Sequence, residues 1–318
     1  MDAHAVPSPF LPGTKLQYAW DSTSLGLLKT CPRLYQYVIL EGYTTDSKKA
    51  DLVAGGLFHD ATATYDRGMA EGLSHEDALR ATVHEFLIAA KDYEPDPDTK
   101  AGKYKNKSAM VRAVIFYLDH RHETDRLKTY RLANGKPAVE LSFAFEITFP
   151  TPSGQPYVLC GHLDRVCEDA NGDLFIEDHK TTTTTPGQYY FDRYDVDNQM
   201  SLYTFAGKVI LETAVHGTII NAVQFLIEHP YNRFVRGMTF RTSDQVEEWY
   251  TDLERWLSMA EWYASNDHWP MNDTACNNYG GCAFRKVCAK SPSVRNIYLR
   301  SDYIQLPPSE RWNPLKPR

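Results

Sequence analysis

Three stretches of alternating apolar and polar residues, joined by short turn sequences, constrain the fold of this chain most strongly. Residues 138–149 read AVELSFAFEITF, residues 157–168 read YVLCGHLDRVCE and residues 173–180 read DLFIEDHK. Because side chains alternate between the two faces of a strand, each stretch predicts a strand with one face in a core. Asn171 and Gly172 are typical of a β-hairpin turn between the second and third strands. The chain therefore contains a unit of three antiparallel strands.

Helical patterns surround this unit on both sides. We predict helices over residues 21–40 (broken near Pro32), 52–70, 74–91 and 108–124, and after the hairpin over 195–213 and 242–265. Ser74 and Thr242 stand in capping-box positions. Two further strands are expected at 217–229 and 234–241. This order predicts an α/β fold of mixed α+β character, with a small mixed central sheet flanked by helices.

Five consecutive regions are expected along the chain. They are an irregular N-terminal segment (1–20), a helical region (21–135), the core (136–265), a cysteine-bearing segment (266–300) and a Pro-rich tail (301–318). The core holds all the predicted strands.

Composition excludes few functions, but it indicates the class of protein and its cellular location. Of 318 residues, 42% are hydrophobic and 24% are charged, as in ordinary globular proteins. No apolar run is long enough to span a membrane, and the first residues lack the layout of a secretory signal, so we expect a cytoplasmic protein without a membrane partner. The net charge of −7 argues against a positively charged coat for nucleic acid, although a local basic groove remains open.

The third strand of the unit ends in charged residues on an otherwise apolar face. Leu174, Ile176, Asp178 and Lys180 share that face, and the hairpin brings Asp164 of the second strand beside them. Two converging carboxylates repel each other unless a cation lies between them, and Mg²⁺ or Mn²⁺ suits oxygen ligands. An adjacent lysine can stabilise a phosphate or position the attacking water. The pattern indicates a metal-assisted phosphodiester hydrolase, the alternative being a solvated strand end.

The motifs together resemble the PD-(D/E)XK nuclease superfamily, in its RecB-like branch. GHLDRV (161–166) and IEDHKT (176–181) resemble the elements that this branch pairs across a hairpin, G-x-x-D or G-x-D with D-x-K-T. NQMSLY (198–203) resembles its Q-x-x-x-Y element, GGLFHD (55–60) its G-x-x-x-H element, and CPRLYQY (31–37) its Cys-Pro-Arg segment. The elements follow the family order from residue 31 to residue 288. The resemblance implies a restriction-endonuclease-like core.

The resemblance also implies a set of metal ligands. Asp164 and Asp178 would bind the metal, with the backbone carbonyl of His179 and the imidazole of His59 as further ligands. Packing between helices is the alternative role for His59. The His179 side chain is expected to reach solvent or DNA. Glu140, on the polar face of the first strand, is a weaker candidate for a supporting role.

Three further residues receive roles from the resemblance. Lys180 would be the catalytic lysine, and Gln199 and Tyr203 would orient Lys180 or the substrate phosphate. Positions i and i+4 share a helix face, so the amide and the phenol can point the same way. A core position is the alternative for Tyr203. The threonines at 181–185 predict either a mobile loop over the substrate or a polar linker.

A regular cysteine array lies near the C-terminus. Cys276, Cys282 and Cys288 are separated by five residues each, and Cys31 is the candidate for a fourth ligand. Four thiolates can bind zinc or an iron–sulfur cluster, and the tight C-x₂₋₄-C spacing of structural zinc sites is missing. AddB-type and CRISPR-associated adaptation nucleases use a similar one-plus-three layout for a [4Fe–4S] cluster, although their first interval is usually C-x₂-C. We therefore expect a [4Fe–4S] cluster, with zinc or free thiols as alternatives. Two more cysteines are predicted to be small buried residues: Cys160 and Cys167.

Nucleic acid is the substrate class that the resemblance implies. Basic residues that could contact phosphate occur in KAGKYKNK (100–107) and at Arg121, Arg126, Lys128 and Arg131. If the helical region and the cysteine segment close over the site, a strand must enter by its end, so we expect an exonuclease on single-stranded DNA ends. Recombination or replication proteins are the expected partners. The alternatives are a non-catalytic DNA-end-binding or recombination accessory protein, and a zinc-stabilised hydrolase of another phosphoester.

Overall fold

Two long strands, β4 (Val139–Pro150) and β5 (Pro156–Glu168), contribute residues to both of the units into which the chain divides. The computed structural model describes residues 6–226 and 233–316. The first unit contains Met1–Asp46, Ser142–Gly161 and Glu247–Arg318, and the second contains Ser47–Leu141 and His162–Val246. Each unit is therefore assembled from separate stretches of sequence.

The second unit is built on a mixed sheet. β5 pairs antiparallel with both β3 (Lys128–Thr129) and β6 (Leu174–Thr182). β6 then pairs parallel with β7 (Gly217–Gln224), which pairs antiparallel with β8 (Arg233–Thr239). The helical elements of this unit are α3 (Asp46–Ala70), α4 (His75–Ala89), α5 (Lys100–Tyr104), α6 (Lys107–Thr124), α7 (Gln188–Asp192), the 3₁₀ helix η2 (Arg193–Val196) and α8 (Asn198–Leu211).

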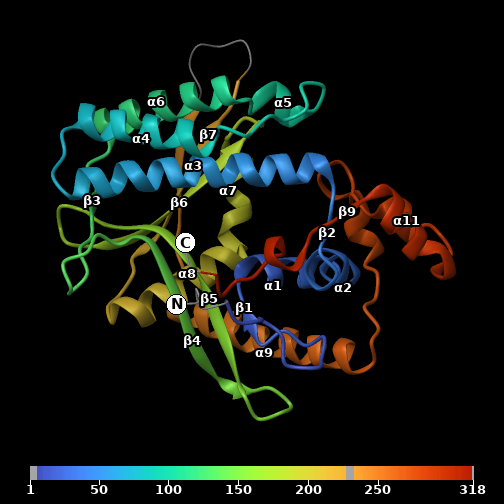
Figure 1. The fold of residues 1–318 in the computed structure, drawn as a ribbon. Helices are drawn as coiled ribbons and strands as arrows, with labels where there is room; N and C mark the ends of the chain where they lie inside the picture. The colour runs from blue at the N-terminus through green and yellow to red at the C-terminus, as the bar shows by residue number, and fades with distance from the viewer. Residues whose placement is uncertain (1–5, 227–232, 317–318) are drawn as a thin grey trace, which may run out of the picture. The chain divides into compact units, whose positions relative to one another are not determined.

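Helices cover both faces of this sheet. On one face α3, α4 and α6 lie side by side (Figure 1) and pack around Phe58, Met110 and Leu118 against Val223 of β7. On the other face α8 approaches β6 so closely that a Cβ at Gly207 would lie 2.7 Å from Cδ1 of Ile176. Burial of these apolar side chains is the main force that holds the layers together. The predicted mixed α/β fold, with a mixed sheet flanked by helices, is confirmed.

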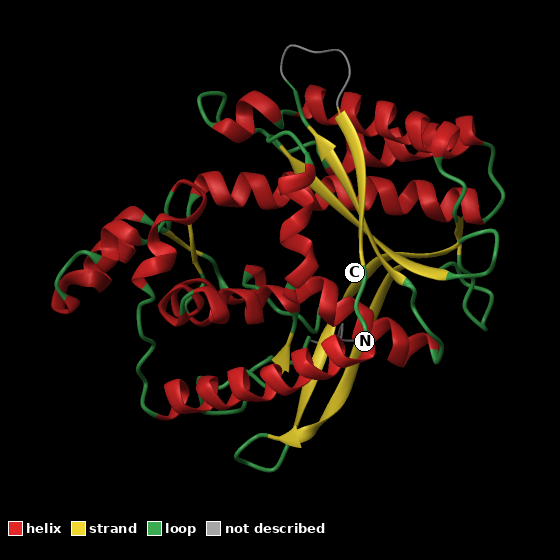
Figure 2. Cartoon of the chain, turned by 180° about the vertical axis from the view of Figure 1, so that it is seen from behind, coloured by secondary structure: helices red, strands yellow, loops and turns green. Residues whose placement is uncertain are grey.

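The first unit combines short strands with helices from both ends of the chain (Figure 2). β1 pairs parallel with the first half of β5, and β2 pairs antiparallel with β9. Trp20, Tyr35 and Trp269 form an aromatic core: Trp20 stacks on Tyr35 with ring centroids 5.6 Å apart, and Trp269 lies tilted against Tyr35 at 5.1 Å. The elements are β1 (Ala19–Trp20), α1 (Ser22–Thr30), α2 (Pro32–Tyr35), the π-helix η1 (Gln36–Leu40), β2 (Tyr43–Thr44), most of α9 (Ser243–Ser265), η3 (Asp273–Gly280), α10 (Arg285–Cys288), η4 (Pro292–Val294), α11 (Arg295–Asp302), β9 (Ile304–Gln305) and η5 (Pro308–Glu310).

Most helix boundaries follow their sequence signals. The break at Pro32 separates α1 from α2, and the caps at Ser74 and Thr242 each accept the backbone N–H expected of them. The helix predicted from residue 195 begins at Asn198, because Asp197 caps it and residues 193–196 form η2. β7 ends at Gln224, so its predicted continuation is not strand at 225–226, and residues 227–229 lie outside the described chain. Among the described helices, none is long and apolar enough to cross a membrane.

Candidate active site

The β5–β6 hairpin carries the two aspartates of the candidate site. In its turn, Asp169 accepts the backbone N–H groups of Asn171 and Asp173, and Gly172 adopts a φ of +86°. The antiparallel pairing of the two strands begins with Glu168 opposite Leu174 and ends with Arg165 opposite Glu177.

Asp164 and Asp178 are the next residues along the two strands. There the Asp164 carboxylate, rather than a backbone carbonyl, accepts the N–H of His179, at 2.8 Å. Because a side chain has replaced the backbone partner, the two strands part where the aspartates stand.

Asp164 lies at the centre of a group of nitrogen and oxygen donors. The Nδ1 atom of His59, on α3, is 3.1 Å from Oδ2 of Asp164. Among the described residues, His59, Glu140 and Asp164 form the group whose ligand atoms all lie within 4.8 Å of one another. The structure therefore brings His59 and Asp164 together as predicted, and adds Glu140.

The backbone at Glu140 departs from the regular strand. Its φ is +49°, in the left-handed region that side-chain-bearing residues rarely adopt. Glu140 is buried, as is Val139, although it belongs to the polar side of the alternating pattern. Strain of this kind is typical of functional sites.

Asp178, Lys180, Gln199 and Tyr203 form a continuous hydrogen-bonded chain. Lys180 Nζ donates to Asp178 Oδ1 at 2.9 Å and to Gln199 Oε1 at 2.7 Å, and Gln199 Nε2 donates to Tyr203 Oη at 2.8 Å. Asp197 caps the first turn of α8 and so orients Gln199. The predicted i, i+4 pair on the helix thus extends the lysine site.

The site shifts the pKa values of its charged groups in opposite directions. Burial favours a higher pKa for Asp164, but the charge of His59 and the hydrogen bonds from His179 and His59 outweigh it and hold that pKa well below its ordinary value. Burial raises the pKa of Asp178, and the charge of Asp164 adds to the rise although Lys180 opposes it. Burial would lower the pKa of Lys180, but the charge of Asp178 more than offsets this. Perturbed groups of this kind are typical of functional sites.

Comparison with known proteins identifies the family. The model of the PD-(D/E)XK nuclease superfamily matches residues 20–289. The chain belongs to the PD-(D/E)XK nuclease superfamily. No curated protein matches this chain. A crystal structure of SSO0001 is similar over 75% of this chain and 76% of that one, at 12% identity and a TM-score of 0.31, and this similarity carries no argument about function.

Members of the PD-(D/E)XK superfamily are generally metal-dependent nucleases, and this donor set fits a divalent ion. One imidazole and two carboxylates within 4.8 Å of one another can bind Mn²⁺ or Mg²⁺. Asp178 is not part of this group, because its carboxylate is bound to Lys180, although its charge influences His59.

The side chain of His179 differs from expectation. It is only 1% exposed and lies against Tyr117, with ring centroids 5.7 Å apart, so it does not reach solvent or DNA. The physical reason is strand alternation, which turns it toward the face covered by α3 and α6.

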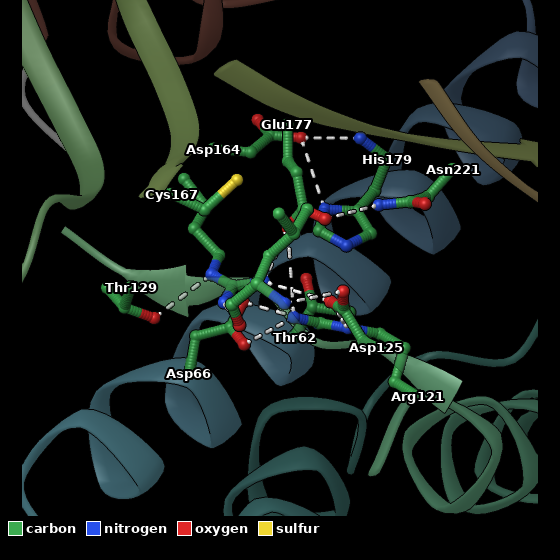
Figure 3. Close-up of polar contacts among 12 residues, drawn as sticks. Thr62, Asp66, Arg121, Asp125, Thr129, Asp164, Cys167, Glu177, His179 and Asn221 are labelled. Atoms are coloured by element: carbon green, nitrogen blue, oxygen red, sulfur yellow. Dashed lines mark hydrogen bonds and ion pairs between the residues drawn. The ribbon is translucent and has the colours of Figure 1, made fainter. Parts of the chain in front are cut away.

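A buried ionic network lies on that same face of this nuclease core. Figure 3 shows Glu177, Asp66 and Arg121 pointing toward one another. Glu177 is fully buried, and its carboxylate lies 2.7 Å from Arg165 and 2.9 Å from Arg236. The charges balance as three against three: Arg121, Arg165 and Arg236 against Asp66, Asp125 and Glu177.

The sequence reasoning missed this network, although one signal was available. Counting back from the hairpin turn places Arg165 directly opposite Glu177. A carboxylate within the apolar run LFIED also needs a buried partner.

All four array cysteines belong to the first unit. Cys31 and Cys282 both raise the pKa of Cys276 and of Cys288, after burial as the largest cause. Asn272 donates its N–H to Cys31 Sγ at 3.3 Å, and Arg33 hydrogen-bonds Cys288. In the described chain no three cysteines bring their sulfurs within 4.8 Å of one another, whereas a single zinc ion would hold four at about 3.8 Å. The cysteines Cys160 and Cys167 are buried, as predicted.

Two of the basic residues predicted to contact phosphate are buried instead. Lys105 is buried and pairs with Asp51 at 3.0 Å, and buried Arg121 pairs with Asp66 at 2.8 Å. Neither is available to a phosphate backbone, because each already neutralises an acid. Lys128 and Arg131 remain exposed.

Proposed function

We propose that this chain is a metal-dependent deoxyribonuclease that hydrolyses phosphodiester bonds at single-stranded DNA ends. The observation that carries the proposal is the convergence of His59, Glu140 and Asp164 within 4.8 Å, with Asp164 on the same hairpin as the Asp178–Lys180 pair. The preference for single-stranded ends rests on the expectation from the sequence that a strand must enter the site by its end. We also propose that the protein is cytoplasmic and that its partners are recombination or replication proteins.

Each residue has a role in this proposal. His59, Glu140 and Asp164 would hold the cation, with Asp178 and the carbonyl of His179 adjoining them. When bound, a divalent cation supplies charge to the phosphate and acidifies a bound water. Lys180, held between Asp178 and Gln199, presents its ammonium group to the phosphate or the attacking water. Tyr203 positions Lys180 through Gln199.

Cleavage of labelled DNA tests the assignment. We expect Lys180→Ala and Asp164→Ala to lose about a thousandfold in rate with Mg²⁺ or Mn²⁺, because Lys180 supplies positive charge to the phosphate and Asp164 holds the cation. Lys208→Ala is the matched control, since Lys208 is an exposed lysine on α8, and it should cleave like the wild type. Tight DNA binding without metal-dependent cleavage by the wild type would instead support the accessory-protein alternative.

End preference requires a separate comparison. End-labelled single strands, end-labelled duplexes and a closed circular plasmid are incubated with the same protein and metal. We expect the linear single strand to be degraded from its end while the plasmid stays closed. Nicking of the plasmid at a comparable rate would rule out the exonuclease.

We also propose that Cys31, Cys276, Cys282 and Cys288 hold a [4Fe–4S] cluster. Cys31 and Cys282 both raise the pKa of the other two thiols, Arg33 and Asn272 donate to two sulfurs, and the wide spacing suits a cluster better than one zinc ion. Protein purified without oxygen should be brown and contain about four iron atoms per chain. A colourless protein with stoichiometric zinc would contradict this and favour the zinc-stabilised alternative.

A further inference from the structure

The pair Arg165–Glu177 stands at the exact end of the β5–β6 ladder. The two residues are opposite each other, and the next residues along the two strands are the candidate ligand Asp164 and its neighbour Asp178. Arg165 Nη1 and Glu177 Oε2 lie 2.7 Å apart, with side chains 4% and 0% exposed. The pair therefore joins the strands at the last position before they part.

Further contacts tie this pair to neighbouring strands. The second carboxylate oxygen of Glu177 accepts from Asn221 of β7 at 3.2 Å and from Arg236 of β8 at 2.9 Å. Arg165 also donates to Thr129 of β3 and to the carbonyl of Leu127, each at 3.0 Å. Glu177 thus connects four strands of the second unit: its own strand β6, and β5, β7 and β8. A shift of β6 along its neighbours would break these contacts.

The network also reaches the helix that carries His59. Arg121 of α6 lies 3.7 Å from Glu177 and binds Asp66 of α3 at 2.8 Å. Asp66 lies seven residues after His59, two turns along the same helix. The elements that supply His59, Asp164 and Asp178 therefore all connect to Glu177.

A contribution to stability does not by itself explain such a network, because well-packed apolar residues often stabilise a core as well as buried ions do. Ion pairs with directional hydrogen bonds instead favour one strand register, because their atoms meet only in that register. A slip of one residue would turn Asp178 and Lys180 to the opposite face of the sheet, away from α8.

We propose that Glu177 and Arg165 are positioning residues, whose pairing fixes where β5 and β6 part and so aims Asp164 at the cation, with the Asp178–Lys180 pair beside it. This inference rests on the proposed function, because it concerns the same metal site. It assigns no contact with substrate to either residue.

Mn²⁺ titration of the full-length protein, followed by the paramagnetic resonance signal of free Mn²⁺, tests the inference without any cleavage assay. We expect Glu177→Gln to bind Mn²⁺ about 10-fold to 100-fold more weakly than the wild type, as for other supports of metal ligands. Arg165→Gln should weaken binding similarly, and the double variant should add little to either change, because the two residues act as one unit.

Asp51→Asn is the matched control. It removes the partner of buried Lys105 in the same unit but contacts neither hairpin strand. We expect it to lower the unfolding temperature and leave Mn²⁺ affinity unchanged within twofold. Equal weakening of Mn²⁺ binding in this control would overturn the inference, because general loosening would then explain the effect.

The outcomes separate the two claims. Wild-type Mn²⁺ affinity in folded Glu177→Gln overturns the positioning role alone, whereas a wild type that binds no Mn²⁺ overturns the proposed function as well. Should Glu177→Gln fail to fold, Glu177→Asp and Arg165→Lys preserve the charges and shift the contacts. Wild-type affinity in both of these would also overturn the inference.

Discussion

Removing the charge of Glu177 should destabilise the protein in a manner that depends on pH. Glu177 is fully buried and meets three guanidinium groups, at 2.7, 2.9 and 3.7 Å. Leaving buried charges without a partner costs about 3–5 kcal/mol. Gln keeps the shape and one acceptor oxygen, so we expect about 3 kcal/mol for Glu177→Gln at pH 7. At 2–4 °C per kcal/mol, the unfolding temperature should fall by about 6–12 °C.

The pH dependence identifies the charge as the cause. Burial acts to raise the pKa of Glu177, but the charges of Arg165, Arg121 and His179 outweigh it and hold that pKa well below its ordinary value. A group with a lowered folded-state pKa contributes stability above its unfolded pKa, about 4.3, and loses it as the pH falls. Between pH 7 and pH 3 the loss in the free energy of unfolding is about 2 kcal/mol, since Glu177 takes up a proton in the unfolded chain and remains ionised in the folded chain. The wild type therefore loses this much free energy of unfolding between pH 7 and pH 3, whereas Glu177→Gln, which lacks the carboxylate, does not.

Urea unfolding at pH 7, 5, 4 and 3, monitored by circular dichroism, measures this. The stability difference between wild type and Glu177→Gln should shrink from about 3 to about 1 kcal/mol over this range. Glu76→Gln is the control, because Glu76 forms an exposed pair with Arg80 and should change stability by less than about 0.5 kcal/mol. A difference that stays constant with pH would refute the reasoning, since lost packing rather than lost charge would then explain it.

Three further predictions concern the other parts of the site. Tyr203→Phe removes the acceptor of the Gln199 amide and should lower the cleavage rate about tenfold without unfolding the protein, which cleavage rates and melting curves check together. Burial favours a lower pKa for His59, but the charge of Asp164 and its hydrogen bond raise the pKa above 6.5. Mn²⁺ must displace the His59 proton, so affinity should increase as the pH rises through a point above 6.5, and His59→Ala should flatten that titration. Cys276→Ser should lower the iron content measured after anaerobic purification, whereas Cys160→Ser, at a buried thiol outside the array, should retain it.

Local patterns were sufficient for much of the hairpin and its neighbours. Alternation predicted β5 and β6, the Asn171–Gly172 turn predicted their antiparallel pairing, and the spacing of Gln199 and Tyr203 predicted a shared helix face. These features depend on periods of two and 3.6 residues, which the order of residues encodes directly. The pairing of Arg165 with Glu177 was also readable, by counting from the turn.

Other features required the complete fold. The left-handed backbone of Glu140 cannot be read from its strand pattern, since alternation predicts a regular strand there. Burial of His179, Lys105 and Arg121 depends on helices that contact them from distant parts of the chain.

The sequence by itself determined which residues carry charge, thiol and hydrogen-bonding groups, and on which strand or helix face most of them lie. Only the tertiary structure decided that Glu140 joins His59 and Asp164. The physical reason is that local periodicity orients a side chain relative to its own element, whereas meetings between distant elements depend on how whole surfaces pack together.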